Sequence, residues 1–554
     1  MAKKFITSWQ RLMGLLKLDK RDVLQVFYYA IFAGLVNLSL PLGIQTIINL
    51  IQGAEISTSW VILVVLVTGG VAFAGVLQIM QIRIVENMQQ KIFTRASFEF
   101  TYRFPKIRMS ELRDFYPPEL ANRFFDTITV QKGLSKLLLD VPAALLQIIF
   151  GLLLLSFYHP FFIIYGILLI LLVLLVFRFT AQKGMDTSLD ESKLKYKVAH
   201  WIQEVARSQV SFKLSGRTSL AVDKNDNLVT EYLKARESHF RVLLMQFVQM
   251  IGFKVLVTAG LLLIGGLLVL NQEMNIGQFV AAEIIILLVI TSVEKLIRGF
   301  ETFYDLLTSL EKIGQVVDKE LDEQKGEEPL NDNNNLTVEL DKVSFGNLSE
   351  KYILNDISLK IVPGSRQLIM GENGSGKSTL LRLITGIIEP TEGNIYVNDF
   401  LLRGIEPNHY RSYIGQCFAE DSPFEGTILE NITFGDKNIP HVDLQRVLQH
   451  IGLLQFIKEQ PKGLNTIIYP QGQHIPYTIS RKIVLARSIV QMPKLLLLDN
   501  PLDQFDDDES KRIIKFLTDK SNPWALVVVS QDLRWMKGCQ RKITLNQGQL
   551  VSIT

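Results

Sequence analysis

A glycine-rich stretch in the second half of the chain has the composition and spacing of a phosphate-binding loop. It reads G-x-x-x-x-G-K-S-T and lies between apolar runs at 367–370 and 380–384, which we interpret as a strand and a helix. Glycines let backbone N–H groups turn inward around a phosphate, and the N-terminus of the following helix adds positive potential. The residues predicted to bind a nucleotide are Gly371, Asn373, Gly374, Ser375, Gly376, Lys377, Ser378 and Thr379.

Two of these side chains, and one carboxylate further along the chain, have specific predicted roles. Lys377 is expected to reach the β- and γ-phosphates, and the Ser378 hydroxyl is expected to bind Mg²⁺. Asp499 ends the apolar run 495–498 and has the position of a Walker B carboxylate, which is a second Mg²⁺ ligand. The chain is therefore predicted to bind ATP or GTP with Mg²⁺.

Further motifs narrow the class of domain. The sequence A-R-S at 486–488 precedes the 495–499 strand, and the sequences F-E-G-T-I and E-N-I occupy 424–428 and 430–432. Together with the phosphate loop, these motifs resemble the nucleotide-binding domain of ABC transporters over residues 336–554. The resemblance implies an α/β P-loop NTPase fold with ATP and Mg²⁺ as its ligands.

Several positions that serve hydrolysis in this family hold other residues. The Walker B glutamate, which polarises the attacking water, is replaced by Asn500, and an amide cannot accept a proton. The switch histidine corresponds to Gln531. The Q-loop glutamine corresponds to Ala419, because the nearby Gln416 is out of register.

The family's LSGGQ motif, which clasps the γ-phosphate from the opposite subunit, corresponds to residues 475–479. Tyr477 and Thr478 replace its two glycines and block a close backbone approach, and Pro476 replaces the serine. The adenine-stacking aromatic corresponds to Asn347, although Tyr352 could stack if the loop shifts. We therefore predict a domain that binds ATP but hydrolyses it poorly, and we assign no catalytic residue.

The first half of the chain has the composition of a membrane domain. Charged residues make up 20% of the 554 residues, and the mean hydropathy is +0.22. Buried helices of a large soluble core are the alternative, but the uninterrupted apolar run 162–172 favours membrane spans of about 20 residues. Six such spans are predicted at 22–51, 58–82, 137–158, 161–179, 243–270 and 276–297.

Lysine and arginine placement predicts the orientation. The segment before the first span is basic, whereas the short connections 52–57, 159–160 and 271–275 contain no lysine or arginine. By the positive-inside rule, both termini are cytoplasmic and these turns face outward. We interpret the basic N-terminus as a topology signal and expect no nucleic-acid partner, and we place the chain in the plasma or inner membrane.

Six spans followed by one nucleotide domain resemble an exporter-type ABC half-transporter. We predict an N-terminal segment at 1–21, an all-α six-helix membrane domain at 22–312, a linker at 313–335 and the nucleotide-binding domain at 336–554. The charged stretches 83–136 and 180–242 are interpreted as helical hairpins that extend into the cytoplasm. The resemblance implies a dimer in which each nucleotide site uses both chains.

A finer pattern concerns the first span. Residues 40–49 are similar to the P-x-x-x-Q-x-x-I-D pattern of peptide and protein exporters, including type 1 secretion ATPases, although Asn49 replaces the aspartate. Such relatives often carry an N-terminal peptidase domain. Because only residues 1–21 precede the first span, we expect no leader-peptide cleavage by this chain.

Three functions are compatible with this sequence. The favoured one is a subunit that pairs with a second, more competent ABC half-transporter chain and exports a peptide, protein or lipophilic substrate. The others are a homodimeric exporter with slow ATP hydrolysis and a nucleotide-gated membrane scaffold or regulator that does not pump. A membrane-fusion protein is a further candidate partner.

Two cysteines and two charged residues of the spans carry further predictions. Cys417 and Cys539 are expected to be free thiols without a metal role, because disulfides are rare on the cytoplasmic side. Lys254 and Glu283 lie inside predicted spans, where ionisable side chains face a cavity or a partner. They could line a substrate path or pair with each other.

Overall fold

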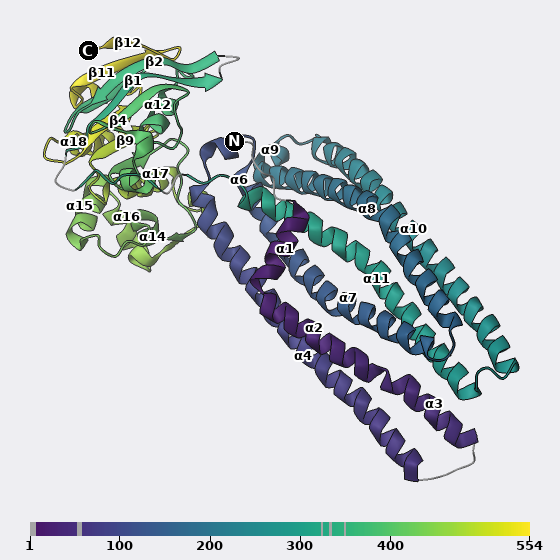
Figure 1. Cartoon of the computed structure of the whole chain (residues 1–554). Coiled ribbons are helices and arrows are strands. Elements are labelled where there is room, and N and C mark those ends of the chain that lie inside the picture. Colours follow the sequence, from purple (N-terminus) through teal and green to yellow (C-terminus); the bar gives the residue numbers. More distant parts are fainter. Residues whose placement is uncertain (1–6, 53–57, 323–324, 332–334, 348–350) are drawn as a thin grey trace. The chain divides into compact units, whose positions relative to one another are not determined.

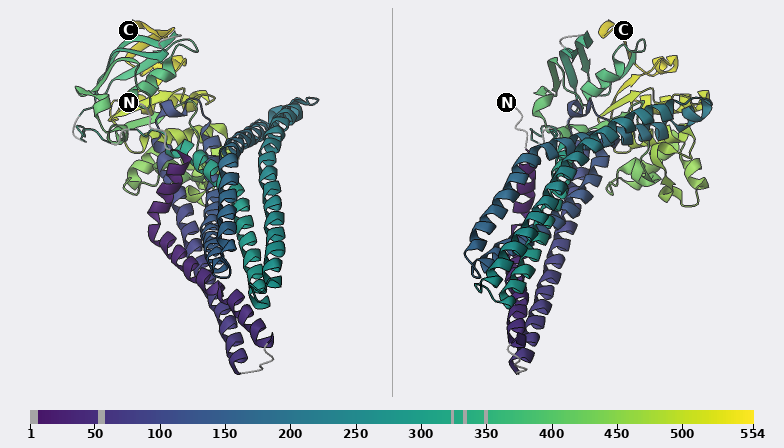
Figure 2. Two further views of the ribbon diagram at one scale, coloured as in Figure 1. Left: turned by 45° about the vertical axis from the view of Figure 1, so that its right-hand side comes forward. Right: turned by 90° about the vertical axis from the view of Figure 1, so that its right-hand side faces the viewer.

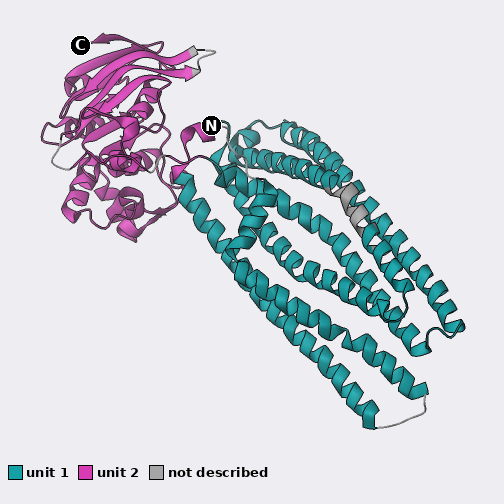
Figure 3. Ribbon diagram, in the orientation of Figure 1, with its two compact units in different colours: residues 1–105, 114–319 teal, residues 106–113, 320–554 magenta. Residues whose placement is uncertain are grey.

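The computed structural model describes residues 7–52, 58–322, 325–331, 335–347 and 351–554, without the side chains at 165, 169, 172–181 and 351. The chain forms two compact units (Figure 3). Unit 1 comprises residues 1–105 and 114–319, and unit 2 comprises residues 106–113 and 320–554.

Unit 1 is built of long helices that run alongside one another (Figures 1 and 2). Its helices are α1 (Ser8–Leu18), α2 (Lys20–Asn37), α3 (Ser39–Gln52), α4 (Thr58–Arg103), α6 (Pro117–Asn122), α7 (Asp126–Ser156), α8 (Phe161–Arg207), α9 (Gln209–Leu214), α10 (Leu220–Leu270) and α11 (Ile276–Val317). Several helices are long because an apolar span continues into a charged, periodic extension, and α7 remains helical through Pro142.

Five helical segments of the described part are long and apolar enough to cross a membrane. They contain the predicted spans 22–51, 58–82, 243–270 and 276–297, and residues 137–156 of the predicted span 137–158. The remaining predicted span, 161–179, lies in α8, where side chains at 172–181 fall outside what the structure describes. Large apolar side chains point outward from α4, with Val65 65% and Ile79 67% exposed, as expected of a surface that faces lipid.

The first span is interrupted. Helix α2 ends at Asn37 and α3 begins at Ser39, because Pro41 cannot continue the backbone hydrogen-bond ladder of the preceding turn.

The pairing suggested for Lys254 and Glu283 is wrong. Lys254 Nζ instead lies 3.0 Å from Glu294 Oε2, so the ion pair joins α10 to α11 at another turn of α11.

Unit 2 contains two larger sheets. The antiparallel sheet has the order β2-β1-β4-β5, and the mainly parallel sheet has the order β12-β11-β3-β10-β9-β6. The strands are β1 (Val338–Asn347), β2 (Lys351–Ile361), β3 (Arg366–Met370), β4 (Glu392–Val397), β5 (Phe400–Leu401), β6 (Ile414–Cys417), β7 (Gly426–Thr427), β8 (Ile467–Ile468), β9 (Leu495–Asp499), β10 (Ala525–Val529), β11 (Arg541–Asn546) and β12 (Gln549–Ile553).

Helices cover the parallel sheet and form a separate group around α14 to α17 (Figure 1). They are α5 (Met109–Leu112), α12 (Lys377–Ile384), α13 (Pro407–Ser412), α14 (Ile428–Thr433), α15 (His441–Ile451), α16 (Leu454–Glu459), α17 (Tyr477–Ile489) and α18 (Asp507–Thr518). Strands β9 and β10 are buried along their whole length, as expected for parallel strands covered on both faces.

The start of the linker in the structure differs from the start predicted from the sequence. Helix α11 continues to Val317, past the predicted linker start at 313, because its apolar periodicity persists to that residue. The following segment joins unit 2, where Leu321 forms an antiparallel bridge with Ile107 and Arg108 N donates to Glu320 O at 3.0 Å. Residues 332–334 of the asparagine-rich stretch lie outside the described residues.

Candidate nucleotide site

The phosphate loop connects β3 to α12, as the sequence predicts, although the helix already begins at Lys377. Gly374 and Gly376 have φ values of +82° and +97°, which favour glycine. A Cβ atom on Gly376 would lie 2.6 Å from Leu354 Cδ2 and 3.0 Å from Ile353 O. The backbone therefore needs glycine at this point to keep the loop closed against β2.

Parallel pairing brings the other predicted ligand to the loop. Strand β10 pairs in parallel with both β3 and β9, so the carboxyl ends of these three strands meet at one edge of the sheet. Asp499, at the end of β9, is 1% exposed and its Oδ2 accepts a hydrogen bond from Ser378 Oγ at 2.5 Å. The two predicted Mg²⁺ ligands are thus adjacent.

Lys377 lies over the loop. Its Nζ donates to Gly371 O at 2.9 Å and Glu372 O at 2.6 Å, and it lies 3.3 Å from Ser375 Oγ. Burial lowers the pKa of Lys377, and the nearby charge of Asp499 opposes that shift. The ammonium group is held by neutral carbonyls, which a phosphate oxygen can replace with a stronger, charge-assisted hydrogen bond.

The other predicted loop residues have different surroundings. Ser375 is 3% exposed, and its carbonyl accepts from Gly548 N at 3.2 Å, so the β11–β12 turn supports the loop. Asn373 and Gly374 are exposed, and Thr379 is half-buried in the first turn of α12. Gly548 was not identified from the sequence, since a glycine in a hairpin turn carries no mark of its tertiary neighbour.

The residues fit a magnesium ion. Mg²⁺ prefers oxygen ligands and is usually held by one or two protein oxygens together with substrate phosphates. The Ser378 hydroxyl and the Asp499 carboxylate present such oxygens side by side. Ser378 and Asp499 would hold the ion, which would neutralise part of the phosphate charge.

The base position of the family is filled by an amide that already has a partner. Asn500 Nδ2 donates to Asp499 Oδ1 at 2.9 Å, and the Asn500 backbone has a φ of +43°. Its side chain therefore orients the Mg²⁺ ligand and has no means of accepting a proton from water. Gln531, at the switch position, is exposed and follows Ser530 at the end of β10.

The loop after β6 is organised by an arginine that sequence reasoning missed. Arg481 of α17 is 2% exposed, and its Nη1 donates to Phe418 O at 2.8 Å and Asp421 O at 3.2 Å. Ala419, at the Q-loop position, is exposed, whereas Gln416 lies within β6 opposite Leu497. Arg481 stands beside Lys482 and in the same helix as Arg487, so the sequence did not single it out.

The segment at the LSGGQ position leads into α17. Pro476 is the N-cap residue, its side chain makes no capping hydrogen bond, and Tyr477 is 46% exposed in the first turn. A large ring thus stands where the family has a glycine at the start of the helix. Close approach of a phosphate to the backbone N–H groups here is sterically opposed.

The candidate adenine-stacking residue has a polar partner. Tyr352 lies opposite Gly346 in the β1–β2 pair, and its hydroxyl donates to Glu392 Oε1 at 2.8 Å. This hydrogen bond raises the pKa of Tyr352. Asn347 lies at the end of β1, beside residues 348–350, which are outside the described part.

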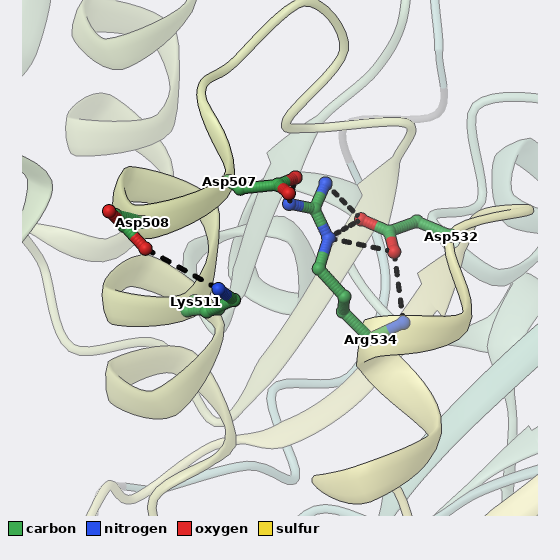
Figure 4. Close-up of polar contacts among 5 residues, drawn as sticks. All are labelled: Asp507, Asp508, Lys511, Asp532 and Arg534. Carbon is green, nitrogen blue, oxygen red and sulfur yellow. Dashed lines mark hydrogen bonds and ion pairs between the residues drawn. The ribbon is translucent and has the colours of Figure 1, made fainter.

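An ion-pair cluster fixes the turn that follows Gln531 (Figure 4). Arg534 binds Asp532 with an Nη2–Oδ2 distance of 2.7 Å, and its Nη1 donates to Asp507 Oδ1 at 2.6 Å. The cluster joins the turn after β10 to the first turn of α18. The neighbouring pair of Lys511 and Asp508 is longer, at 3.4 Å, and is exposed.

A phosphate loop on a parallel sheet, with an apolar helical unit in the same chain, defines a membrane protein with a P-loop NTPase domain. The ABC transporter family matches residues 354–503, and the ABC transporter transmembrane region matches residues 23–293. The chain therefore belongs to the ABC transporters. The predicted fold class is confirmed, with the transmembrane and ATP-binding regions fused in one half-transporter chain of the exporter type.

Curated relatives cover part of the chain. The lactococcin-G-processing and transport ATP-binding protein of Lactococcus lactis subsp. lactis is 27% identical over 301 residues, covering 52% of this chain and 42% of the relative. The toxin RTX-I translocation ATP-binding protein of Actinobacillus pleuropneumoniae is 26% identical over 294 residues, covering 52% and 41%. In these alignments the chain spans less than half the length of each relative.

A solved structure shares the fold over nearly the full length. A bacterial Atm1-family ABC exporter with ATP bound aligns with a TM-score of 0.85 at 17% identity, covering 96% of this chain and 95% of that structure. The family match implies ATP binding by unit 2, and the transmembrane region makes this a membrane protein.

Proposed function

We propose that this chain is a subunit of an ATP-dependent export system that binds Mg-ATP through residues 371–379 and Asp499 but hydrolyses it poorly. One observation carries the proposal. The two predicted Mg²⁺ ligands, Ser378 and Asp499, lie side by side, whereas Asn500 occupies the base position and its amide donates to Asp499. An amide in that position supports nucleotide binding without proton transfer.

The names of the relatives support a peptide or protein substrate. One relative is named for lactococcin-G processing and transport, and another for toxin translocation. Nothing in the described spans encodes a particular substrate, so a lipophilic molecule is the alternative cargo. A membrane-fusion protein is a proposed further partner, by analogy with type 1 secretion.

We propose that the chain pairs with a second, different ABC half-transporter. A homodimer would contain two copies of the altered segment 475–479 and of Asn500, so neither of its sites would be complete. Pairing with an intact chain restores a base in the partner's own site. That site would still receive the altered segment from this chain, so turnover would remain below that of a fully intact pair.

Purification of the complex from native membranes should recover a second ABC chain in equal amount. The physical reason is that a nucleotide site needs residues from two chains, and an intact partner supplies what this chain lacks. Mass spectrometry identifies the subunits, and phosphate release from the same sample measures ATPase activity. Recovery of a homodimer with ordinary turnover would contradict both the heterodimer and the impaired hydrolysis.

We also propose that both termini are cytoplasmic. Besides the distribution of lysine and arginine, a contact supports this orientation: His159 Nε2 and Glu273 Oε2 lie 3.3 Å apart, which joins the turn before α8 to the turn before α11. Two connections without lysine or arginine are therefore neighbours at one end of the unit. Ser57, in the third such connection, lies outside the described residues.

Cysteines introduced at His159 and Gln272 should react with a membrane-impermeant maleimide in intact cells, and one at Ser521 should not. The expectation follows from the positive-inside rule. The unmodified chain is the matched control, because burial raises the pKa of Cys417 and of Cys539 to about 12 and keeps both thiols protonated. Labelling at Ser521 in intact cells, or protection of both turns, would refute the topology.

A further inference from the structure

Unit 1 contains a cavity of about 80 Å³ between α2, α4, α7 and α11. Helix α7 packs against α2, α4 and α11, and α4 packs against α2 and α11. Small residues make the space, among them Ala30, Ala33, Gly34, Ala143 and Gly151. Because an ammonium, a carboxylate or several waters fit such a volume, its polar lining decides what it can bind.

The polar lining consists of amides and one ammonium group. The residues concerned are Asn37, Gln78, Gln81, Gln147 and Lys295. They come from all four helices, and none of the described lining residues is acidic. A cluster of this kind offers many hydrogen-bond donors and a positive charge, with no protein carboxylate to neutralise it.

Gln81 is a buried polar residue of the cavity whose amide nitrogen has no hydrogen-bond acceptor among the described residues. Its side chain lines the cavity and is 4% exposed. A buried donor without a partner loses its hydration free energy without compensation. Gln147 is positioned beside it, since its Oε1 accepts from the buried Ser292 Oγ at 2.9 Å, which leaves its amide N–H groups for another acceptor.

Lys295 of α11 differs from Lys254 of α10 in its surroundings. Lys254 is bound to Glu294, which also forms an ion pair with Arg298. No carboxylate within the described ranges lies in ion-pair distance of Lys295. Lys295 is exposed, so its ammonium group is open to an anionic group that enters the cavity.

We propose that this cavity binds a carboxylate group of the transported peptide, either the terminal carboxylate or an acidic side chain. Lys295 supplies the charge, and the amides of Gln81 and Gln147 supply hydrogen bonds to the carboxylate and to the adjoining peptide group. The volume fits such a group, whereas a phospholipid headgroup with its glycerol backbone is larger.

The depth of the cavity agrees with this assignment, which rests on the proposed export function. Gln81 and Lys295 lie near the ends of the predicted spans 58–82 and 276–297, and Gln147 lies in the first half of 137–158. In the proposed topology, these positions are on the cytoplasmic side. A peptide entering from the cytoplasm would therefore meet the cavity before it crosses the membrane.

The test is equilibrium binding of three radiolabelled peptides to the full chain in lipid nanodiscs. Acetyl-trialanine carries a terminal carboxylate, acetyl-Ala-Glu-Ala amide carries only a side-chain carboxylate, and acetyl-trialanine amide carries neither. At least one acidic peptide should bind about tenfold or more tightly than the neutral amide. The identity of the tighter peptide tells which carboxylate is recognised.

Variants locate the effect. Lys295→Gln should reduce the preference for the acidic peptide over the neutral amide to about onefold, which is equal binding. Lys295→Arg should retain the preference, and Gln81→Leu should weaken binding of the acidic peptide several-fold. Lys254→Gln is the matched control and should retain the preference, because Lys254 lies outside the cavity lining and Glu294 keeps Arg298 as a partner. Equal binding of all three peptides, no saturable binding of any, or an unchanged preference in Lys295→Gln would overturn the proposal.

Failure of this inference is distinguishable from failure of the proposed function. ATP binding is measured on the same nanodiscs, since it depends on unit 2 residues that the variants leave unchanged. A carboxylate preference without ATP binding would refute the proposed function and keep the cavity assignment. ATP binding without a carboxylate preference would refute the cavity assignment and leave the proposed function standing.

Discussion

The purified chain alone, reconstituted as a homodimer, should release phosphate from ATP at no more than about 0.1 s⁻¹. Typical enzymes turn over at about 10 s⁻¹, and one positioned general base contributes ~10²–10⁴-fold. Here Asn500 holds the base position and donates to Asp499 at 2.9 Å, so the residue at that position offers no proton acceptor beside the predicted Mg²⁺ ligands. Steady-state phosphate release measures the rate, with Lys377→Ala as the background.

Restoring the base alone should recover little activity. Asn500→Glu places a carboxylate beside Asp499, yet the opposite subunit would still present Pro476, Tyr477 and Thr478 to the γ-phosphate. Groups that act as one constellation have strongly non-additive effects. We therefore expect less than a tenfold gain from Asn500→Glu, and a larger gain when Tyr477 and Thr478 are also changed to glycine.

Turnover of several per second in the unmodified homodimer would show that the degeneracy hypothesis is wrong. Two other carboxylates near the site would then become candidate bases. Glu420 forms an ion pair with Arg382, and Asp503 is exposed in the loop between β9 and α18. Comparison of Glu420→Gln with Asp503→Asn would identify which one is used.

Local sequence patterns predicted the elements that carry the nucleotide site. The glycine spacing of the loop and the apolar run before Asp499 each depend on neighbours in the chain, so the strands β3 and β9 could be located within a residue. The start of α12 was placed too late, at the apolar residue 380, because a helix whose first turn is polar shows no hydrophobic periodicity there.

Contacts between distant segments could not be predicted in the same way. The Lys254–Glu294 pair depends on which turns of α10 and α11 face each other, and no local sequence pattern fixes that register. Arg481 acts on carbonyl groups in a loop some 60 positions earlier, with no composition signal in that loop. The cavity at Gln81 lies between four helices and is made by small residues on α2 and α7, which no single periodic pattern reveals.

Lys377→Ala should weaken Mg-ATP binding by roughly 10- to 150-fold. A hydrogen bond to a charged group contributes about 1.5–3 kcal/mol, and each 1.4 kcal/mol changes the dissociation constant tenfold. In the structure the ammonium group is bonded only to oxygen atoms of the loop itself, at Gly371, Glu372 and Ser375, so a phosphate can take their place. Isothermal titration calorimetry with ATP and Mg²⁺ gives the dissociation constant.

The control for this variant is Lys360→Ala, which removes a lysine of the same unit from β2. Lys360 is exposed and its Nζ lies 2.6 Å from Glu339 Oε2, so its loss changes the net charge equally without touching the loop. ATP affinity should therefore stay within about twofold in Lys360→Ala, as usual for an exposed ion pair. An equal loss in both variants would indicate general charge attraction, and unchanged affinity in Lys377→Ala would refute the assignment of residues 371–379 as the phosphate site. The two outcomes separate because Lys377 bonds to a loop carbonyl and lies near Asp499, where the β- and γ-phosphates are expected to bind, whereas Lys360 pairs with Glu339.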